Sequence, residues 1–310
     1  MQINGIHHVT AIAGPARRNL DFYSRVLGLR LVKKTVNFDD PTTWHLYFGD
    51  ADGNPGTILT FFPWEHVAPG RLGVGETEAT SFRIPEAAIG YWAHRFVASG
   101  VAHDAPRKRF GETMLAFRDP DGTRLALVAV PGSESEPAWD NGEVPAEVAI
   151  RGFHGVTLLL DKTETTAAIL RDVFGFVEAG REDSTVRMRA VGAAHGGIVD
   201  LRAAGGFLPA RMGAGSVHHI AFRAGDDAEQ ERMVKQLAET FGLRTTGQRD
   251  RDYFRSVYFR EPGGVLFEIA TDAPGFTIDE PADGLGGTLK LPAQYEKRRA
   301  EIEAVLPALA

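Results

Sequence analysis

The feature that most constrains the fold of this chain is a pattern that recurs four times along it. Each copy opens with a short run of alternating apolar and polar residues, followed by a polar break and a helical segment. A glycine stands near each predicted helix end, at Gly28, Gly100, Gly175 and Gly242, as is typical of helix C-caps. Further alternating runs broken by turn residues follow each helix. Each copy therefore predicts a β-α-β-β-β unit.

The spacing of the copies predicts how the chain divides into domains. The copies begin with "GIHHVTAI" at 5, "ATSFRIP" at 79, "GFHGVTLLL" at 152 and "SVHHIAF" at 216. Between the second and third copies, residues 131–150 are rich in proline, acidic residues and serine, which is typical of a linker. We expect two tandem domains of two units each, at 1–135 and 150–275. A tail at 276–310 should carry a charged helix that packs back on the body.

Composition excludes several classes of protein. The formal net charge of −7 argues against a broad nucleic-acid footprint. The absence of cysteine excludes disulfides, thiolate catalysis and Cys-based zinc or iron–sulfur sites. No apolar run approaches the ~18–20 residues of a membrane helix, and the N-terminus lacks the pattern of a signal peptide. We expect a cytoplasmic protein with neither nucleic acid nor membrane as a partner.

Two pairs of adjacent histidines occupy matching places in the first and fourth copies. They are His7 and His8, and His218 and His219, in a chain with ten histidines. Neighbouring residues of a strand face opposite sides, so only one histidine of each pair can face inward unless a bulge intervenes. We expect the second histidine of each pair to face inward.

The stretches "GIHHVT…LDFYSRVLGLRLVKKTVNFDDPTTWHLYFGD" and "HHIAF…EPGGVLFEIATD", together with the four units, resemble the vicinal oxygen chelate superfamily. That superfamily includes glyoxalase I, extradiol dioxygenases and fosfomycin-resistance enzymes. The resemblance covers nearly the whole chain and is strongest for the branch of ring-cleaving dioxygenases that act on hydroquinones. It implies an α+β fold in which βαβββ units pair and curl into incomplete barrels around a metal. It also implies that the metal ligands lie on the first and last strands of a unit.

An alignment of the four units in register tests which residues could be those ligands. The first-strand positions hold His8, Thr80 or Ser81, Gly155 and His219, and the last-strand positions hold Thr60, Ala126, Leu201 and Glu268. Only His8, His219 and Glu268 are ligand-type residues, whereas His154 aligns with His7 and is not expected to bind. The first and fourth units should therefore share one barrel. Catechol extradiol enzymes differ, because they draw all three ligands from the third and fourth units.

Two imidazoles and one carboxylate leave three positions open on an octahedral ion, as in the facial triad of non-heme Fe(II) oxygenases. Glu268 lies in the apolar run "VLFEIA", where an unpaired carboxylate would cost several kcal/mol. A divalent cation removes that problem. We expect Fe(II), with Mn²⁺, Zn²⁺ and Ni²⁺ as alternatives, and no organic cofactor.

Four further residues are candidates for catalysis. Tyr258 stands ten residues before Glu268, on the neighbouring strand of a predicted hairpin. The resemblance implies that an arginine and a tyrosine, here Arg251 and Tyr258, lie beside the substrate. His7 and His218 could support the ligands or act as acid–base groups. The alternatives are a core tyrosine and a solvated arginine.

The resemblance implies a ring-cleaving, extradiol-type dioxygenase that takes O₂ and a small aromatic substrate, either a hydroquinone or a catechol. One alternative is a metal-dependent glyoxalase-like isomerase or thiol transferase, which usually needs a fourth protein ligand. Thr60 at the fourth position speaks against it. A second alternative is a ligand-sequestering protein without chemistry, although such proteins commonly lack the metal ligands. The sequence does not distinguish a monomer from a homo-oligomer.

Overall fold

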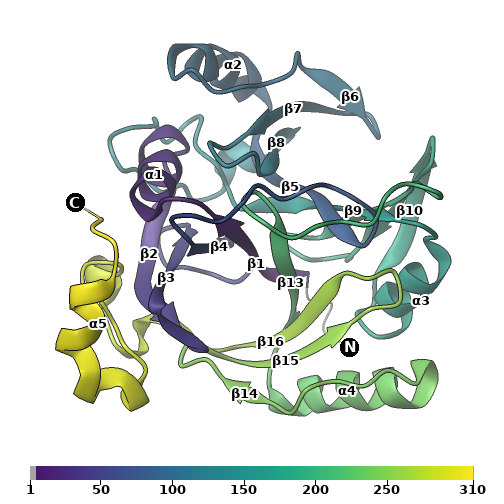
Figure 1. Cartoon of the computed structure of the whole chain (residues 1–310). Helices are drawn as coiled ribbons and strands as arrows, with labels where there is room; N and C mark the ends of the chain where they lie inside the picture. The colour runs from purple at the N-terminus through teal and green to yellow at the C-terminus, as the bar shows by residue number, and fades with distance from the viewer. Residues whose placement is uncertain (1–4, 310) are drawn as a thin grey trace.

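The computed structural model describes residues 5–309 and contains two curled eight-stranded sheets (Figure 1). Each unit supplies four strands, and the element order is β-α-β-β-β in all four units. The first sheet has the order β14-β15-β16-β13-β1-β4-β3-β2 and the second has the order β10-β11-β12-β9-β5-β8-β7-β6. Units one and four therefore share one sheet and units two and three share the other. The pairing of units one and four confirms the expectation that these two units share one barrel.

The first sheet is built on β1 and β13, which run antiparallel at its centre. Its strands from the first unit are β1 (Ile6–Ala13), β2 (Arg30–Asn37), β3 (Asp40–Gly49) and β4 (Ile58–Pro63). Its strands from the fourth unit are β13 (Val217–Ala224), β14 (Arg249–Asp250), β15 (Phe254–Arg260) and β16 (Leu266–Pro274).

The second sheet repeats this plan with β5 and β9 at its centre. Its strands from the second unit are β5 (Glu76–Pro85), β6 (Arg107–Arg109), β7 (Glu112–Arg118) and β8 (Arg124–Val130). Its strands from the third unit are β9 (Phe153–Leu160), β10 (Val177–Glu182), β11 (Thr185–Arg189) and β12 (Ile198–Ala203).

One helix follows the first strand of each unit and covers the convex side of its sheet. These helices are α1 (Ala16–Asp21), which continues as a π-helical turn over Phe22–Val26, α2 (Ile89–Ala98), α3 (Glu164–Asp172) and α4 (Asp227–Phe241). The four predicted helix-end glycines all have left-handed backbone, with φ between 62° and 74°. Any side chain at these positions would strain the backbone. No helix within 5–309 is long and apolar enough to cross a membrane.

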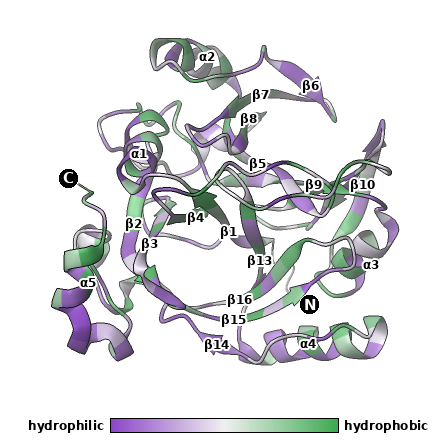
Figure 2. Ribbon diagram, in the orientation of Figure 1, coloured by the Kyte–Doolittle hydropathy of each residue, from purple (hydrophilic) through white to green (hydrophobic). Residues whose placement is uncertain are grey.

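Apolar side chains concentrate on the inner strands, as the green colour of β4 in Figure 2 shows. β1 and β9 are buried along their full length, so the polar side chains that they carry, such as His8 and Thr10, are buried as well. The segment 131–150 also packs: Val144 is 1% exposed and the Asn141 side chain donates to the Ser24 carbonyl. The domain boundaries remain predictions, because each sheet takes strands from both sides of this segment.

The C-terminal tail packs against β2 and β3 of the first unit. After short 3₁₀ turns it forms α5 (Arg299–Val305), which lies outside β2 and β3 in Figure 1. Ile302 is buried against Val36, and the Trp44 indole donates to the Pro307 carbonyl at 2.8 Å. The Lys33 ammonium is fully buried between the carboxylates of Asp279 and Glu280. These contacts attach the tail to the first unit.

Candidate metal centre

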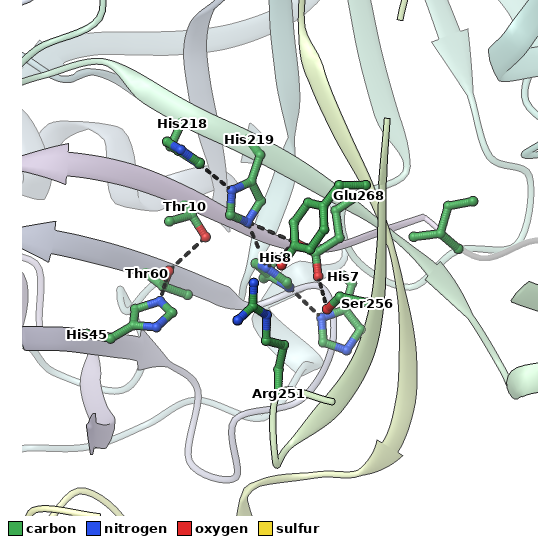
Figure 3. A network of polar contacts seen from close by, with 12 residues as sticks. His7, His8, Thr10, His45, Thr60, His218, His219, Arg251, Ser256 and Glu268 are labelled. Atoms are coloured by element: carbon green, nitrogen blue, oxygen red, sulfur yellow. Dashed lines mark hydrogen bonds and ion pairs between the residues drawn. The ribbon is translucent and has the colours of Figure 1, made fainter. Parts of the chain in front are cut away.

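Three strands that lie side by side in the first sheet carry His8 on β1, His219 on β13 and Glu268 on β16. Their side chains converge on one point on the concave face (Figure 3). The two Nε2 atoms lie 3.3 Å apart, and Oε2 of Glu268 lies 2.9 Å from His219 Nε2 and 3.4 Å from His8 Nε2. All three residues are at most 5% exposed. Three residues that are far apart in the sequence therefore form one compact cluster.

The spacing of these three atoms fits a shared cation. Metal–ligand distances of about 2.0–2.2 Å place neighbouring ligand atoms roughly 2.8–3.6 Å apart in octahedral or tetrahedral geometry. The observed separations fall within this range. Among residues 5–309, no group donates a hydrogen bond of suitable geometry to the buried Oε2 atom of Glu268, although such an atom normally receives one. A metal ion would satisfy it.

The carboxylate of Glu268 is held in its charged form. Burial alone would raise its pKa, but the neighbouring imidazoles of His8 and His219 outweigh burial and lower the pKa well below its usual value. The other oxygen, Oε1, accepts a short hydrogen bond from the Ser256 hydroxyl. This contact fixes the rotation of the carboxylate and directs Oε2 toward the imidazoles.

A β-bulge lies at the first histidine of each pair. In the β1–β13 register, Ile6 pairs with Phe222 and His8 with Ala221, so His7 is an extra residue on β1. Thr10 pairs with His219 and Ala11 with Val217, so His218 is extra on β13. A bulge changes the strict alternation of side chains. Adjacent residues of a regular strand point to opposite faces, but these bulges allow the two histidines of each pair to lie in contact.

His7 and His218 support the two candidate ligands. Nδ1 of His7 lies 2.9 Å from Nδ1 of His8, and Nδ1 of His218 lies 2.8 Å from Nδ1 of His219. A metal-binding Nε2 must be unprotonated, so the ligand's Nδ1–H would donate to the neighbouring histidine. Burial lowers the pKa of His7 well below its usual value and that of His218 to about 4. Both are therefore neutral at pH 7 and able to accept.

A cavity of about 380 Å³ opens beside the three residues. Its walls include the aromatic rings of Phe38, Phe62, Trp64 and Phe254. Tyr258 and Arg251, both candidates from the sequence, also line it. Tyr258 is the direct cross-strand partner of Glu268, as its predicted hairpin position requires. Its ring centre lies 5.6 Å from that of His219.

Arg251 brings a permanent positive charge to the cavity. Its guanidinium carbon lies 5.7 Å from the Tyr258 ring centre, and Nη2 lies 3.3 Å from Asp39. Burial would lower the pKa of Arg251, but the charges of Tyr258, Asp39 and Glu268 raise it. Burial and Glu268 raise the pKa of Tyr258 well above its usual value. The phenol therefore keeps its proton at pH 7 and can donate it to an oxygen.

A hydrogen-bonded chain on the opposite wall was not found by sequence reasoning. The Tyr47 hydroxyl lies 2.9 Å from His45 Nδ1, and His45 Nε2 lies 2.9 Å from the Thr60 hydroxyl. The Thr60 hydroxyl lies 2.8 Å from that of Thr10 (Figure 3). Register relates these residues to known positions: Tyr47 pairs with Thr60 as Tyr258 pairs with Glu268. The alternation in "TWHLYF" could have placed His45 and Tyr47 on the cavity side.

The register also corrects two positions of the sequence alignment. In the second sheet Ala79 pairs with Thr157 as His8 pairs with Ala221, so Ala79, rather than Thr80 or Ser81, occupies the His8 position. Asp200 pairs with Thr157 as Glu268 pairs with Ala221. The fourth-strand position of unit three is therefore Asp200 and not Leu201. Asp200 stands three residues after Gly197, whereas Glu268 stands four after Gly264, so an alignment on the turn glycines misses Asp200 by one residue.

Asp200 does not recreate the centre in the second sheet. Arg187, at the position equivalent to Tyr258, donates to both oxygens of Asp200 at 2.8 and 2.9 Å. His154 lies 3.1 Å from Glu112, which also pairs with Arg187. Burial opposes ionisation of Glu112, but His154 and Arg187 lower its pKa to about 2. The guanidinium of Arg187 thus neutralises Asp200, as a metal ion would do for Glu268. His154 belongs to this second cluster and not to the candidate metal centre.

Comparison with known proteins identifies the family of the chain from two matched segments, one in each half of the sequence. A family model described as the glyoxalase/bleomycin resistance protein/dioxygenase superfamily matches residues 5–127 and 152–269. The chain belongs to this superfamily. Maize glyoxalase I shares its fold, with a TM-score of 0.66 at 14% identity over 87% of this chain and 92% of that one.

Relatives within the superfamily cover almost the whole chain. MhqO of Bacillus subtilis, provisionally named a ring-cleaving dioxygenase, is 46% identical over 96% of this chain and 94% of its own length. A chlorohydroquinone/hydroquinone 1,2-dioxygenase of Sphingobium indicum is 33% identical over 97% of this chain and 95% of its own. A crystal structure of a Bacillus subtilis protein, also provisionally titled a dioxygenase, has a TM-score of 0.95 at 45% identity. That match covers 100% of this chain and 98% of the other.

Proposed function

We propose that this member of the superfamily is an Fe(II)-dependent dioxygenase that cleaves the ring of hydroquinone-type aromatics. The observation that carries the proposal is the convergence of His8, His219 and Glu268 beside an aromatic-walled cavity. Its relatives' names, one of which specifies chlorohydroquinone and hydroquinone, support the reaction class. Bound Fe(II) would supply coordination positions for a substrate oxygen and dioxygen, and electron transfer between them.

The side chains of the cavity suit a flat aromatic alcohol. Phe62, Trp64 and Phe254 offer apolar faces against which a ring can stack. The guanidinium of Arg251 would pair with an ionised substrate oxygen. Because its pKa is raised, Arg251 keeps its proton and acts as an anchor. Proton donation to a reacting oxygen falls to the Tyr258 hydroxyl, which is protonated and faces the same cavity.

His7 and His218 would orient the ligands. Each accepts a hydrogen bond from the Nδ1–H of the following histidine in the tautomer that frees Nε2. Such outer partners fix the ring and increase the basicity of the ligand. His7 is only 1% exposed, which favours an orienting role over proton exchange, whereas His218 is half-buried and lines the cavity.

The position of Thr60 argues against an isomerase or thiol transferase with four protein ligands. Thr60 occupies the register position in unit one that Glu268 occupies in unit four. Its hydroxyl is engaged by Thr10 and His45. A fourth protein ligand is thus replaced by a neutral hydrogen-bonding group, and three protein ligands leave room for both substrate and dioxygen.

Anaerobic loading with Fe(II), followed by oxygen-electrode measurements with hydroquinones and catechols, tests the proposal. We expect one iron per chain and O₂ consumption that depends on a hydroquinone. Glu268→Ala, treated in the same way, should retain no iron and consume no O₂. Activity with Zn²⁺ or Ni²⁺ and without O₂ consumption would instead indicate an isomerase. Absence of metal from the wild-type chain would indicate a ligand-sequestering protein.

A further inference from the structure

The second sheet contains a cavity of about 320 Å³ on its own concave face. Its floor is formed by residues that are equivalent, by strand register, to His8 of the candidate metal centre and to three residues of the hydrogen-bonded chain beside that centre. Ala79 takes the position of His8, Ser81 that of Thr10, Ala116 that of Tyr47 and Ala126 that of Thr60. All four line the cavity. Small side chains have therefore replaced the functional ones and left open space at the same place in the fold.

The rim of this cavity is strongly basic. Five arginines line it, against two carboxylates, and they are Arg107, Arg109, Arg118, Arg124 and Arg202. The carboxylates are Glu78, which pairs with Arg202, and Asp104. His103 also lines the rim, but its Nδ1 is 2.9 Å from the Val101 carbonyl. The chain as a whole carries a net charge of −7, so the charge of this rim is opposite in sign to the net charge of the protein.

Two of these arginines face each other without a compensating partner. Arg118 on β7 and Arg124 on β8 are direct cross-strand partners, an arrangement in which like charges repel. Among the residues described, neither forms an ion pair. Burial and the charge of Arg118 lower the pKa of Arg124, and the more distant Glu76 and Glu78 only partly oppose this. Two guanidinium groups that extend from paired strand positions offer several donors to an anion that carries two or more oxygens.

The small floor residues lie directly below this arginine pair. Ala116 precedes Arg118 by two residues on β7, and Ala126 follows Arg124 by two on β8, so all four side chains project to one face of the sheet. The result is open space capped by two cations. We propose that the cavity of the second sheet binds a small multivalent organic or inorganic anion, a carboxylate or a phosphate, between Arg118 and Arg124.

This site is separate from the candidate metal centre and does not depend on the reaction assigned there. Arg187 pairs with Asp200 at the position in the second sheet that Glu268 holds in the first, so this carboxylate is already engaged by a guanidinium. The first sheet would thus bind a cation and the second sheet an anion. The second site uses the unit-two half of its sheet, where no carboxylate stands at the position of Glu268.

Isothermal titration calorimetry of the full chain with maleate and, separately, with inorganic phosphate at low ionic strength tests the proposal. We expect saturable binding of at least one anion, and the tighter one identifies the preferred chemistry. The double variant Arg118→Gln/Arg124→Gln should bind at least about tenfold more weakly, because two charge-assisted hydrogen bonds are lost. The matched control Arg232→Gln/Arg244→Gln changes the net charge equally at exposed positions and should bind as the wild type does.

A second variant keeps both charges and removes the space. Ala116→Leu adds a side chain over the floor of the cavity, at a position that is not fully buried, and should also weaken binding by about tenfold or more. Circular dichroism checks that each variant is folded. The proposal is overturned if the wild type binds neither anion at millimolar concentration. It is also overturned if the arginine variant or Ala116→Leu binds as tightly as the wild type. Equal losses in the variant and its control would have the same meaning.

Discussion

The two oxygens of Glu268 have different surroundings, which makes Ser256 a positioning residue at the metal centre. Oε1 is held by the Ser256 hydroxyl while Oε2 faces the two imidazoles. We expect Ser256→Ala to leave the fold intact and weaken Fe(II) binding by about tenfold, the lower end of the range for outer-shell contacts. Anaerobic Fe(II) titration measures this. Thr185→Val removes the hydroxyl at the equivalent position of the second sheet and should leave the affinity unchanged.

Each of the three candidate ligands should be necessary for metal binding. Replacing His8, His219 or Glu268 by alanine removes one of three protein ligands, and we expect each variant to lose more than about 90% of its iron after desalting. Elemental analysis of the purified variants measures the loss. His154→Ala is the matched control, because His154 lies in the second sheet beside Glu112. Loss of iron in His154→Ala would show that the centre has been placed in the wrong sheet.

Tyr258 should contribute to turnover and not to metal retention. Its hydroxyl is no part of the three-residue cluster, yet its ring lies beside His219 on the cavity wall. We expect Tyr258→Phe to keep its iron and to lower kcat about 10- to 100-fold, as loss of a proton donor does. Tyr91→Phe is the control, because Tyr91 lies on α2 and does not line the cavity, and its kcat should equal that of the wild type. Comparable kcat values for Tyr258→Phe and the wild type would remove Tyr258 from the mechanism.

At the scale of elements, the repeat was predictable and its irregularities were not. Alternation and glycine placement indicated the four units because each strand and helix end obeys a local rule. The bulges at His7, His218 and His154 break that rule, and a bulge leaves no fixed sequence signal. His8 and His219 were identifiable because each follows its bulge at the same offset. Asp200 was missed because it stands one residue nearer to its turn glycine than Glu268 does. The tail's attachment to β2 is a long-range contact that no local pattern encodes.

The turn between β7 and β8 contains a buried carboxylate that should make stability depend on pH. Asp119 accepts hydrogen bonds from the Tyr23 hydroxyl at 2.9 Å and the Thr123 amide at 2.7 Å. Burial, together with the charge of Asp121, raises its pKa from 3.8 to about 6. Between these values the folded state holds a proton that the unfolded state has released. The contribution of Asp119 to stability therefore falls as the pH rises through this window.

Asp119→Asn removes this titration while preserving the shape of the side chain. We expect the unfolding free energy of the variant, relative to the wild type, to increase by about 2–3 kcal/mol between pH 4 and pH 7. Urea denaturation at several pH values measures the difference. Asp52→Asn, at an exposed position, should follow the wild-type profile. A difference between Asp119→Asn and the wild type that does not change with pH would contradict the assignment.

At the scale of the whole molecule, the two sheets bind the halves of the chain together. Each sheet contains four strands from before segment 131–150 and four from after it. The central pairs β1–β13 and β5–β9 are antiparallel ladders between the halves. The candidate metal centre takes His8 from one half and its other two candidate ligands from the second half. Neither half can form the centre alone, although each carries two complete units.

This arrangement predicts that the connecting segment is dispensable once the protein has folded. Gly142 and Glu143 are exposed, so a protease site introduced there should be cut without disturbing either sheet. We expect the cut protein to elute at the volume of the intact chain and to retain its iron, because two buried strand ladders hold the pieces together. Size-exclusion chromatography with elemental analysis of the peak measures both. Two independently folded tandem domains would instead separate after cutting, and the iron would be released.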